Sequence, residues 1–133
     1  MAGKSDYLEN EILDHILGGA DWPRPSPVHI ALYTVAPTDA GGGTEVTGGS
    51  YTRASVTNNP TNFPAASGGA KANGTAITFP AATADWGTIV AFGIFDAGSG
   101  GNLLYWGPIT PNRVIPNGAT AAFAIGDLDI TED

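Results

Sequence analysis

The glycine-rich stretch at residues 38–51, TDAGGGTEVTGGSY, has the composition of a loop that could hold a phosphate group, with five glycines in fourteen residues. A phosphate loop of the Walker type needs a Lys followed by Ser or Thr, and a dinucleotide fingerprint needs three set glycines that open a helix. Here Gly41, Gly42 and Gly43 precede Thr44, Glu45 and Val46, and the next expected element is a strand. Because Glu45 would also repel a phosphate, we predict a connection between strands whose glycines permit positive φ.

Nucleophilic catalysis has few residues available. The chain has no cysteine, so a nucleophile would be Ser or Thr and would need a neighbouring base. The two histidines, His15 and His29, fall on a predicted helix and a predicted strand, and Gly98-Ser99-Gly100 lacks the outer spacing of a nucleophile elbow. We therefore expect both histidines to be surface or core residues.

Carboxylates are the remaining candidates for chemistry. An acidic cluster at the C-terminal end offers oxygen ligands that suit calcium, but it lacks EF-hand spacing, and we expect solvated acids there. A glycosidase would need two acids across a cleft, and the other candidates each stand beside a turn, where Asp commonly bonds to the local backbone. The cluster contains Asp127, Asp129, Glu132 and Asp133, and the turn acids are Asp39, Asp85 and Asp96. The sequence predicts no enzyme, no metal, no cofactor and no small-molecule substrate.

The overall charge excludes further classes of partner. Thirteen acidic residues against five basic ones give a net charge of −8, which is unfavourable for nucleic acid and for an anionic membrane surface. Charged residues make up only 14% of the chain, against an average of about 25%. With 19 glycines and 10 prolines, this composition indicates a strand-and-turn protein. The N-terminal segment has acids through its apolar part, so we expect neither a signal peptide nor a membrane span, and synthesis in the cytoplasm.

One helix is predicted, over residues 5–18. Its apolar residues fall on one face at helical spacing, Ser5 or Asp6 can cap its start, and Gly18 with Gly19 can end it. The apolar face comprises Leu8, Ile12, Leu13, Ile16 and Leu17. A proline-rich linker follows at residues 20–27. We expect the helix to pack on its own subunit, with packing on a neighbour as the alternative.

The remainder, residues 28–130, shows the alternating pattern of strands. Strands are predicted at 28–35, 51–57, 75–80, 88–96, 102–109, 113–115 and 120–130, separated by Gly, Pro and Asn clusters. Residues 45–46 are a candidate short strand within the glycine-rich stretch. Residues 88–96 are apolar almost throughout, as in a strand covered on both faces. The prediction is a single domain of mainly β structure, an antiparallel β-sandwich or jelly-roll-like barrel with one short N-terminal amphipathic helix.

The aromatic residues have two expected roles. Phe92, Phe95 and Phe123 are predicted to lie in the core. Trp86 and Trp106 stand next to turns and are better candidates for contact surfaces.

Three stretches together resemble a family of small bacteriophage virion proteins. They are SDYLENEILDHILGG, HIALYTVAPTDAGGGTEVTGGSYTRASVT and ITFPAATADWGTIVAFGIFDAGSGGNLLYWGPI, and they span nearly the whole chain. Similar sequences often carry tail-fibre labels, and similar small β-rich proteins serve as capsid cement in tailed phages. The resemblance implies a virion structural protein and brings no catalytic residues.

From the resemblance we expect a capsid-decorating (cement) protein that bridges capsid subunits on the capsid surface. Its expected partners are the major capsid protein and copies of itself, as a trimer. The alternative is a tail-fibre or baseplate component that recognises or positions a receptor. The expected interface residues are Gly41, Gly42, Gly43, Glu45, Val46, Trp86, Trp106, Leu8, Ile12 and Ile16.

Overall fold

The computed structural model describes residues 3–132 and confirms a mainly β fold with one short helix. A six-stranded sheet has the order β1-β8-β7-β2-β3, with β4 also paired to β2, and two further pairs, β10-β5 and β6-β9, form separate two-stranded sheets. Every pairing is antiparallel. The elements are β1 (Gly3–Lys4), α1 (Asp6–Ile16), β2 (Val28–Val35), β3 (Thr44–Glu45), β4 (Ala54–Val56), β5 (Ala70–Ala72), β6 (Ile77–Thr78), β7 (Gly87–Phe95), β8 (Leu103–Ile115), β9 (Ala122–Phe123) and β10 (Asp129–Thr131).

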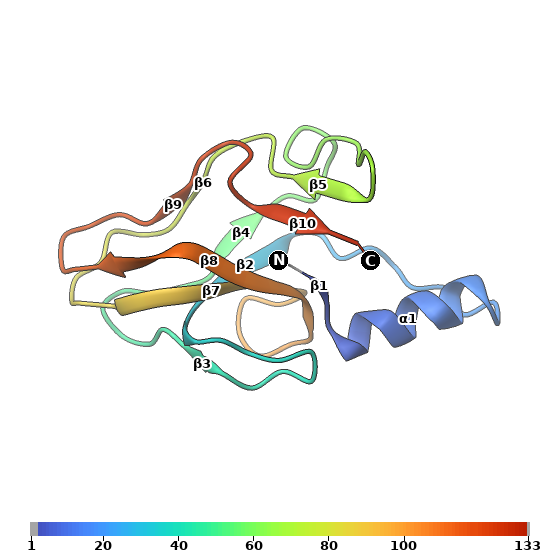
Figure 1. The fold of residues 1–133 in the computed structure, drawn as a ribbon, viewed down its shortest axis with the longest axis horizontal. Helices are drawn as coiled ribbons and strands as arrows, with labels where there is room; N and C mark the ends of the chain where they lie inside the picture. Colours follow the sequence, from blue (N-terminus) through green and yellow to red (C-terminus); the bar gives the residue numbers. More distant parts are fainter. Residues whose placement is uncertain (1–2, 133) are drawn as a thin grey trace.

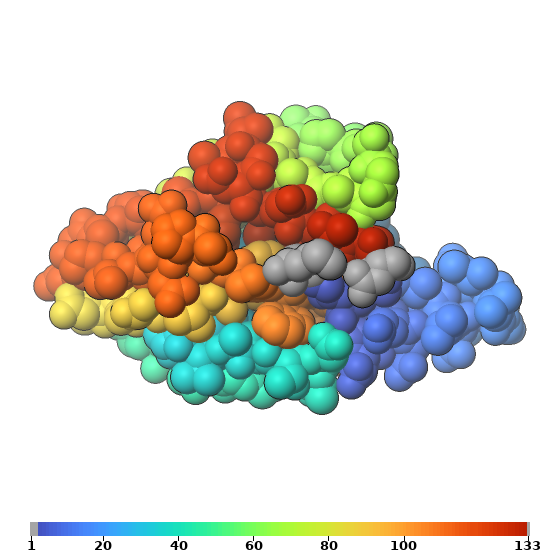
Figure 2. All heavy atoms as spheres, viewed as in Figure 1, coloured from blue at the N-terminus to red at the C-terminus, as the bar shows by residue number. Residues whose placement is uncertain are grey.

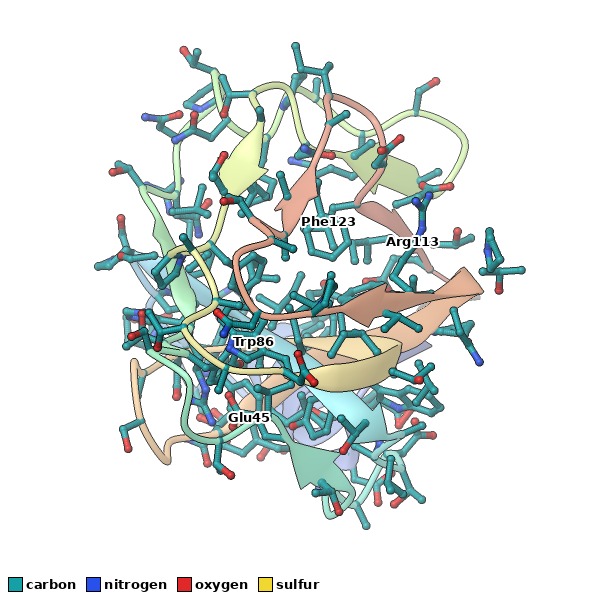
Figure 3. The ribbon with its side chains drawn as sticks, turned by 90° about the vertical axis from the view of Figure 1, so that its left-hand side faces the viewer. Glu45, Trp86, Arg113 and Phe123 are labelled. Atoms are coloured by element: carbon teal, nitrogen blue, oxygen red, sulfur yellow. The ribbon has the colours of Figure 1, made fainter. Side chains whose placement is uncertain are left out.

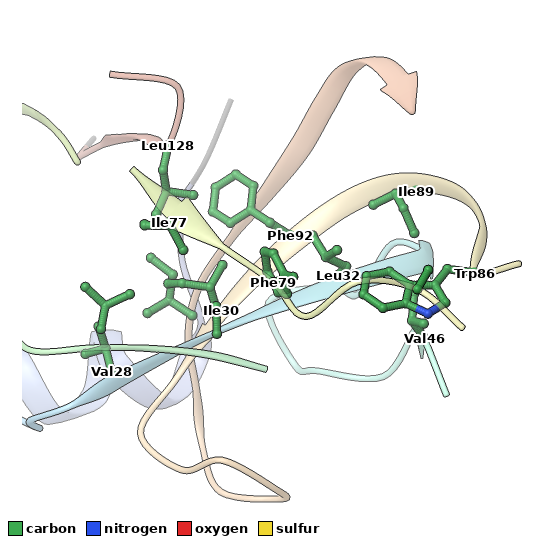
Figure 4. Close-up of a cluster of buried hydrophobic side chains, with 14 residues drawn as sticks. Val28, Ile30, Leu32, Val46, Ile77, Phe79, Trp86, Ile89, Phe92 and Leu128 are labelled. Atoms are coloured by element: carbon green, nitrogen blue, oxygen red, sulfur yellow. The ribbon is translucent and has the colours of Figure 1, made fainter. Parts of the chain in front are cut away.

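The small sheets lie over one face of the six-stranded sheet, so the fold is sandwich-like and not a closed barrel (Figure 1). The main core fills the space between these layers (Figure 4). Phe123 of β9 points into this space, where its ring packs edge-on against Phe92 of β7 at 6.0 Å between centroids (Figure 3). The core is formed around Val28, Ile30, Leu32, Ile77, Phe79, Ile89, Phe92 and Leu128.

The opposite face of the six-stranded sheet is also covered. Alternate residues of β2, Ala31 and Tyr33, join Ala91, Phe95 and Leu103 in a second buried cluster. Successive strand residues point to opposite faces, so burial of both sets explains the nearly continuous apolar sequence of β2 and β7.

The helix is attached to the sheet at its first turn. The buried hydroxyl of Ser5 accepts a hydrogen bond from the Leu8 amide (3.2 Å) and donates one to the Leu103 carbonyl, while the Ser5 amide donates to the Leu104 carbonyl (2.8 Å). α1 ends at Ile16, slightly before the predicted residue 18, and Gly19 follows with φ of +80°.

Several strands differ from their predicted bounds. Predicted residues 102–109 and 113–115 are one strand, β8, in which residues 109–112 bulge opposite Val90 of β7. Predicted residues 120–130 are two strands, because Gly126 has φ of +83° in a turn closed by a hydrogen bond from Asp127 to Ala124. Strand β5 lies where only a loop was expected, since its pairing with β10 is long-range and leaves no local signal.

Candidate functional site

Three of the expected interface residues are buried in the chain's own core. Leu8 is 2% exposed, Val46 4% and Trp86 4%, so the expectation that they form contact surfaces is corrected. The Trp86 indole donates to the Gly49 carbonyl (2.9 Å) and meets the Tyr51 ring edge-on at 5.3 Å. Proximity to a turn misled the prediction for Trp86, because the glycine-rich stretch folds over the indole.

The glycine-rich stretch is a hairpin-like connection, as predicted, with β3 paired to β2. At two positions of this stretch the structure requires glycine. At Gly43 (φ +74°) a Cβ would lie 2.6 Å from the Val35 carbonyl oxygen, and at Gly49 (φ +58°) it would lie 2.9 Å from the Trp86 indole nitrogen. Gly41 and Gly42 also have positive φ but have open space around them, so they stay the interface candidates of this stretch.

Glu45 belongs to an internal ion pair rather than to a free surface. Its carboxylate accepts two hydrogen bonds from the Arg53 guanidinium (both 2.9 Å) and one from the Tyr51 hydroxyl (2.6 Å). Arg53 also donates to the carbonyls of Ala97 and Gly100 (both 2.8 Å). The guanidinium carbon stands 3.7 Å from the centre of the Phe95 ring, a cation–π contact. The glycine-rich stretch and the 97–100 turn are thus tied to one side chain.

This environment changes the ionisation of the groups around Glu45. Burial raises the pKa of Tyr51, and its hydrogen bond to Glu45 raises it further. Burial, with the charge of Glu45, raises the pKa of Tyr33 to about 12. For Arg53, burial lowers the pKa, but the hydrogen bonds and charge of Glu45 outweigh that effect and raise it overall. Arg53 is therefore charged and the tyrosines beside it are neutral at physiological pH.

Trp106 is half-buried on the second cluster of the sheet. Its indole nitrogen donates to the Asp39 carboxylate (2.9 Å), so this tryptophan holds the 38–41 turn of its own chain. The expected contact surface at Trp106 is therefore partly occupied from within.

The C-terminal half of α1 is exposed to solvent, in contrast to its buried first turn. Leu13 is 56% exposed, Ile16 69% and Leu17 74%, whereas Ile12 is half-buried. We call Leu13, Ile16 and Leu17 the helix tip. Figures 1 and 2 show α1 projecting from one end of the molecule, beyond the sheets. Half of the large hydrophobic side chains exposed among residues 3–132 belong to this tip, with Val35, Val114 and Ile125 scattered elsewhere.

A pocket of about 380 Å³ opens beside the buried half of α1; we call it the helix-side pocket. Its walls are mainly apolar and come from α1, the 22–28 segment, β5 and β10, with Leu8, Ile12, Trp22, Phe63, Leu128 and Ile130 prominent. Two exposed cations, Arg24 and Lys71, stand among its lining residues. These two cations and Trp22 are not among the residues predicted to form a site, although in a chain with only five basic residues each exposed cation is informative.

One carboxylate of the helix-side pocket is already partnered. Glu132 accepts a hydrogen bond from the Tyr105 hydroxyl (2.9 Å) and forms an ion pair with Lys4. Burial, together with the hydrogen bond and charge of Glu132, raises the pKa of Tyr105. Glu132 is thus separated in role from Asp127 and Asp129, with which it was grouped in the sequence, and Asp133 lies outside the described residues.

The turn carboxylates bond locally. Asp96 accepts from the Asn102 amide (2.7 Å), Asp85 from the Asn117 amide (2.8 Å), and Asp39 from Trp106. Within residues 3–132, no three or more His, Cys, Asp and Glu side chains gather in a way that suits a metal ion. The same part of the chain contains no helix long and apolar enough to cross a membrane. The arrangement most suited to binding is the helix tip with the helix-side pocket.

Comparison with known proteins identifies the family. A search of curated proteins found no match. The family model described as "Podophage GP4 fiber I protein gp80" matches residues 3–131, nearly the whole chain, which confirms the resemblance to tailed-phage virion proteins. The chain therefore belongs to the podophage GP4 fiber I protein gp80 family, a family of virion structural proteins.

Proposed function

We propose that the protein is a fibre-type component of the podophage tail, which acts by binding other virion proteins and not by catalysis. The observation that carries this proposal is the match of residues 3–131 to a family described as a fibre protein. The sequence resemblance alone favours capsid decoration, with a tail fibre as the alternative. The family description favours the second, and capsid decoration stays an untested prediction.

The geometry supports a role in protein contacts. The polar groups best suited to chemistry are engaged within the chain: Glu45 with Arg53, Glu132 with Lys4, two of the turn aspartates with backbone amides and the third with the Trp106 indole. Exposed apolar surface, by contrast, is concentrated at one end, on the helix tip. A compact body with a projecting apolar segment suits a module that is joined to others in a fibre.

Location and copy number in the intact particle test the proposal. Quantitative mass spectrometry of purified virions gives the ratio of this chain to the major capsid protein, and cryo-EM or antibody labelling gives its position. A tail fibre predicts a small multiple of the tail symmetry and label on the tail. Label spread over the head, with on the order of hundreds of copies as expected for a symmetric capsid lattice, would overturn the fibre proposal and favour capsid decoration.

A further inference from the structure

We propose that the helix tip of one copy of this chain inserts into the helix-side pocket of a second copy. The proposal goes beyond the location of the protein on the virion, because it names the surface through which copies of the chain associate. It rests on the apolar surfaces, the charges and the direction of α1.

The apolar stripe of α1 is only half covered by its own subunit. Leu8, Ile12 and Ile16 follow each other at intervals of four residues on one face of the helix. Leu8 and Ile12 line the helix-side pocket, while Ile16 lies beyond it and is 69% exposed. The stripe therefore continues out of the pocket into solvent, and a second helix laid alongside would extend the same apolar contact.

The helix tip cannot fill the pocket of its own subunit. Ser5 and Leu8 fix the first turn of α1 to the sheet, and Ile16 lies two helical turns further on, about 12 Å along the axis. Figure 1 shows α1 pointing away from β5 and β10, which contribute walls of the pocket. Only another molecule can bring a helix tip to this pocket.

The charges on the two surfaces are complementary. Residues 6–16 contain four carboxylates and no Lys or Arg. Glu9 lies one turn before Leu13, and Asp14 lies three residues before Leu17, so both carboxylates border the helix tip. Arg24 and Lys71 at the pocket form no ion pair within residues 3–132, where Lys4 and Arg53 account for the two ion pairs present. The carboxylate beside the pocket, Glu132, is already neutralised by Lys4.

A second copy fits these features better than a small ligand does. The pocket is of a size that also holds a small apolar molecule, about 300–1,000 Å³ being usual for ligand sites. A small ligand, however, would leave the helix tip exposed and Arg24 and Lys71 without carboxylates. Insertion of a helix tip covers the tip, fills the pocket and pairs the charges, and reciprocal insertion in a dimer or cyclic insertion in a trimer would close into a symmetric oligomer.

The test is the mass of the full-length chain in solution, measured by sedimentation equilibrium over a range of concentrations at low salt. Wild type should form a dimer or a trimer. Leu13→Ser with Ile16→Ser should weaken association by about tenfold or more, and so should Arg24→Glu with Lys71→Glu. Adding Asp14→Lys to the Arg24→Glu, Lys71→Glu variant should recover part of the loss, because the charges are again opposite.

Arg113→Glu is the matched control, since Arg113 is an exposed cation on β8, outside the pocket lining, and this change should leave association at the wild-type level. Circular dichroism checks that each variant is folded. A monomeric wild type at all concentrations overturns the proposal, as do oligomers that are unaffected by the helix-tip variant or a charge-reversed variant that Asp14→Lys does not improve. Wild-type monomers that bind an apolar dye in the pocket would assign it to a small ligand. Because these measurements need no virion, their failure leaves the fibre proposal standing.

Discussion

Replacement of Arg53 by methionine should destabilise the fold by about 3 kcal/mol. Arg53 donates two hydrogen bonds to Glu45 and one each to the carbonyls of Ala97 and Gly100. The methionine side chain keeps an apolar stem over Phe95 but removes all four donors. Removal of one partner of a buried ion pair costs about 3–5 kcal/mol. The Arg53 side chain is 7% exposed, but the Glu45 side chain, which would lose its partner, is 24% exposed. Because water still reaches this carboxylate, the lower end of the range applies.

Much of the lost stability comes from the Glu45 carboxylate, which Arg53→Met leaves without a cationic partner. This predicts the behaviour of a double variant. Glu45→Gln in the Arg53→Met background removes the uncompensated charge, and the amide oxygen can still accept from the Tyr51 hydroxyl. The double variant should therefore be more stable than Arg53→Met alone. A destabilisation of about 3 kcal/mol is a large share of the 5–15 kcal/mol typical of a folded domain, and it should lower Tm by roughly 10 °C.

Urea unfolding followed by tryptophan fluorescence measures these differences. Arg113→Met is the control, because Arg113 is exposed and takes part in none of the ion pairs within residues 3–132, so its loss should cost less than about 0.5 kcal/mol. If Arg53→Met and Arg113→Met unfold at the same urea concentration, the ion pair does not hold the loops as argued.

Three further changes test separate parts of the fold. Gly43→Ala should destabilise the fold more than Gly42→Ala, because the new Cβ would lie 2.6 Å from the last carbonyl oxygen of β2, whereas Gly42 has open space. Both variants share the strain of positive φ, about 1 kcal/mol. Equal losses of stability in urea would contradict the clash at Gly43. Leu8→Ala should cost about 2–5 kcal/mol and Leu13→Ala much less, since the two side chains are 2% and 56% exposed; a reversed order in thermal unfolding would place the helix wrongly. The pKa of Tyr33 is raised from 10.0 to about 12, so between these pH values the folded state keeps a proton that the unfolded state loses. The free energy of unfolding should therefore fall as pH rises from 10 to 12, and Tyr33→Phe should make this fall shallower. An unchanged dependence of stability on pH would refute the raised pKa.

The local signals in the sequence were sufficient for the long elements. Period-two alternation located β2 at residues 28–35, a nearly continuous apolar run located β7 within one residue of 88–96, and the Ser5 cap with the apolar helix face located α1. The unbroken apolar run of β7 also indicated burial of both faces of the sheet, which the two core clusters confirm. Each of these features is determined by residues that are close in the sequence, and a periodic pattern of apolar residues reveals such local structure.

Long-range features could not be derived in the same way. Strand β5 is defined by pairing with β10, nearly 60 residues away by the register Ala72 with Asp129, and alanine and lysine have no strong strand preference. Trp86 is buried because the stretch around Gly49 crosses it, and Glu45 is occupied because Arg53, in the residues that lead into β4, reaches it. The sequence predicts that Trp86 and Glu45 make contacts with a partner. Whether such a side chain contacts a partner or its own chain depends on the tertiary fold.

The distribution of charge on α1 links solubility with assembly. An isolated helix of 11 residues is marginal in water, and Ser5 and Leu8 stabilise only its first turn, so an exposed Leu13, Ile16 and Leu17 would favour aggregation by themselves. The four carboxylates of residues 6–16 oppose unspecific contact between copies through like-charge repulsion. That repulsion is relieved only where a cation meets the helix, and the helix-side pocket presents Arg24 and Lys71 next to an apolar wall. In the proposed insertion, the same acids that oppose unspecific contact would favour the orientation in which the helix of one copy meets Arg24 and Lys71 of another.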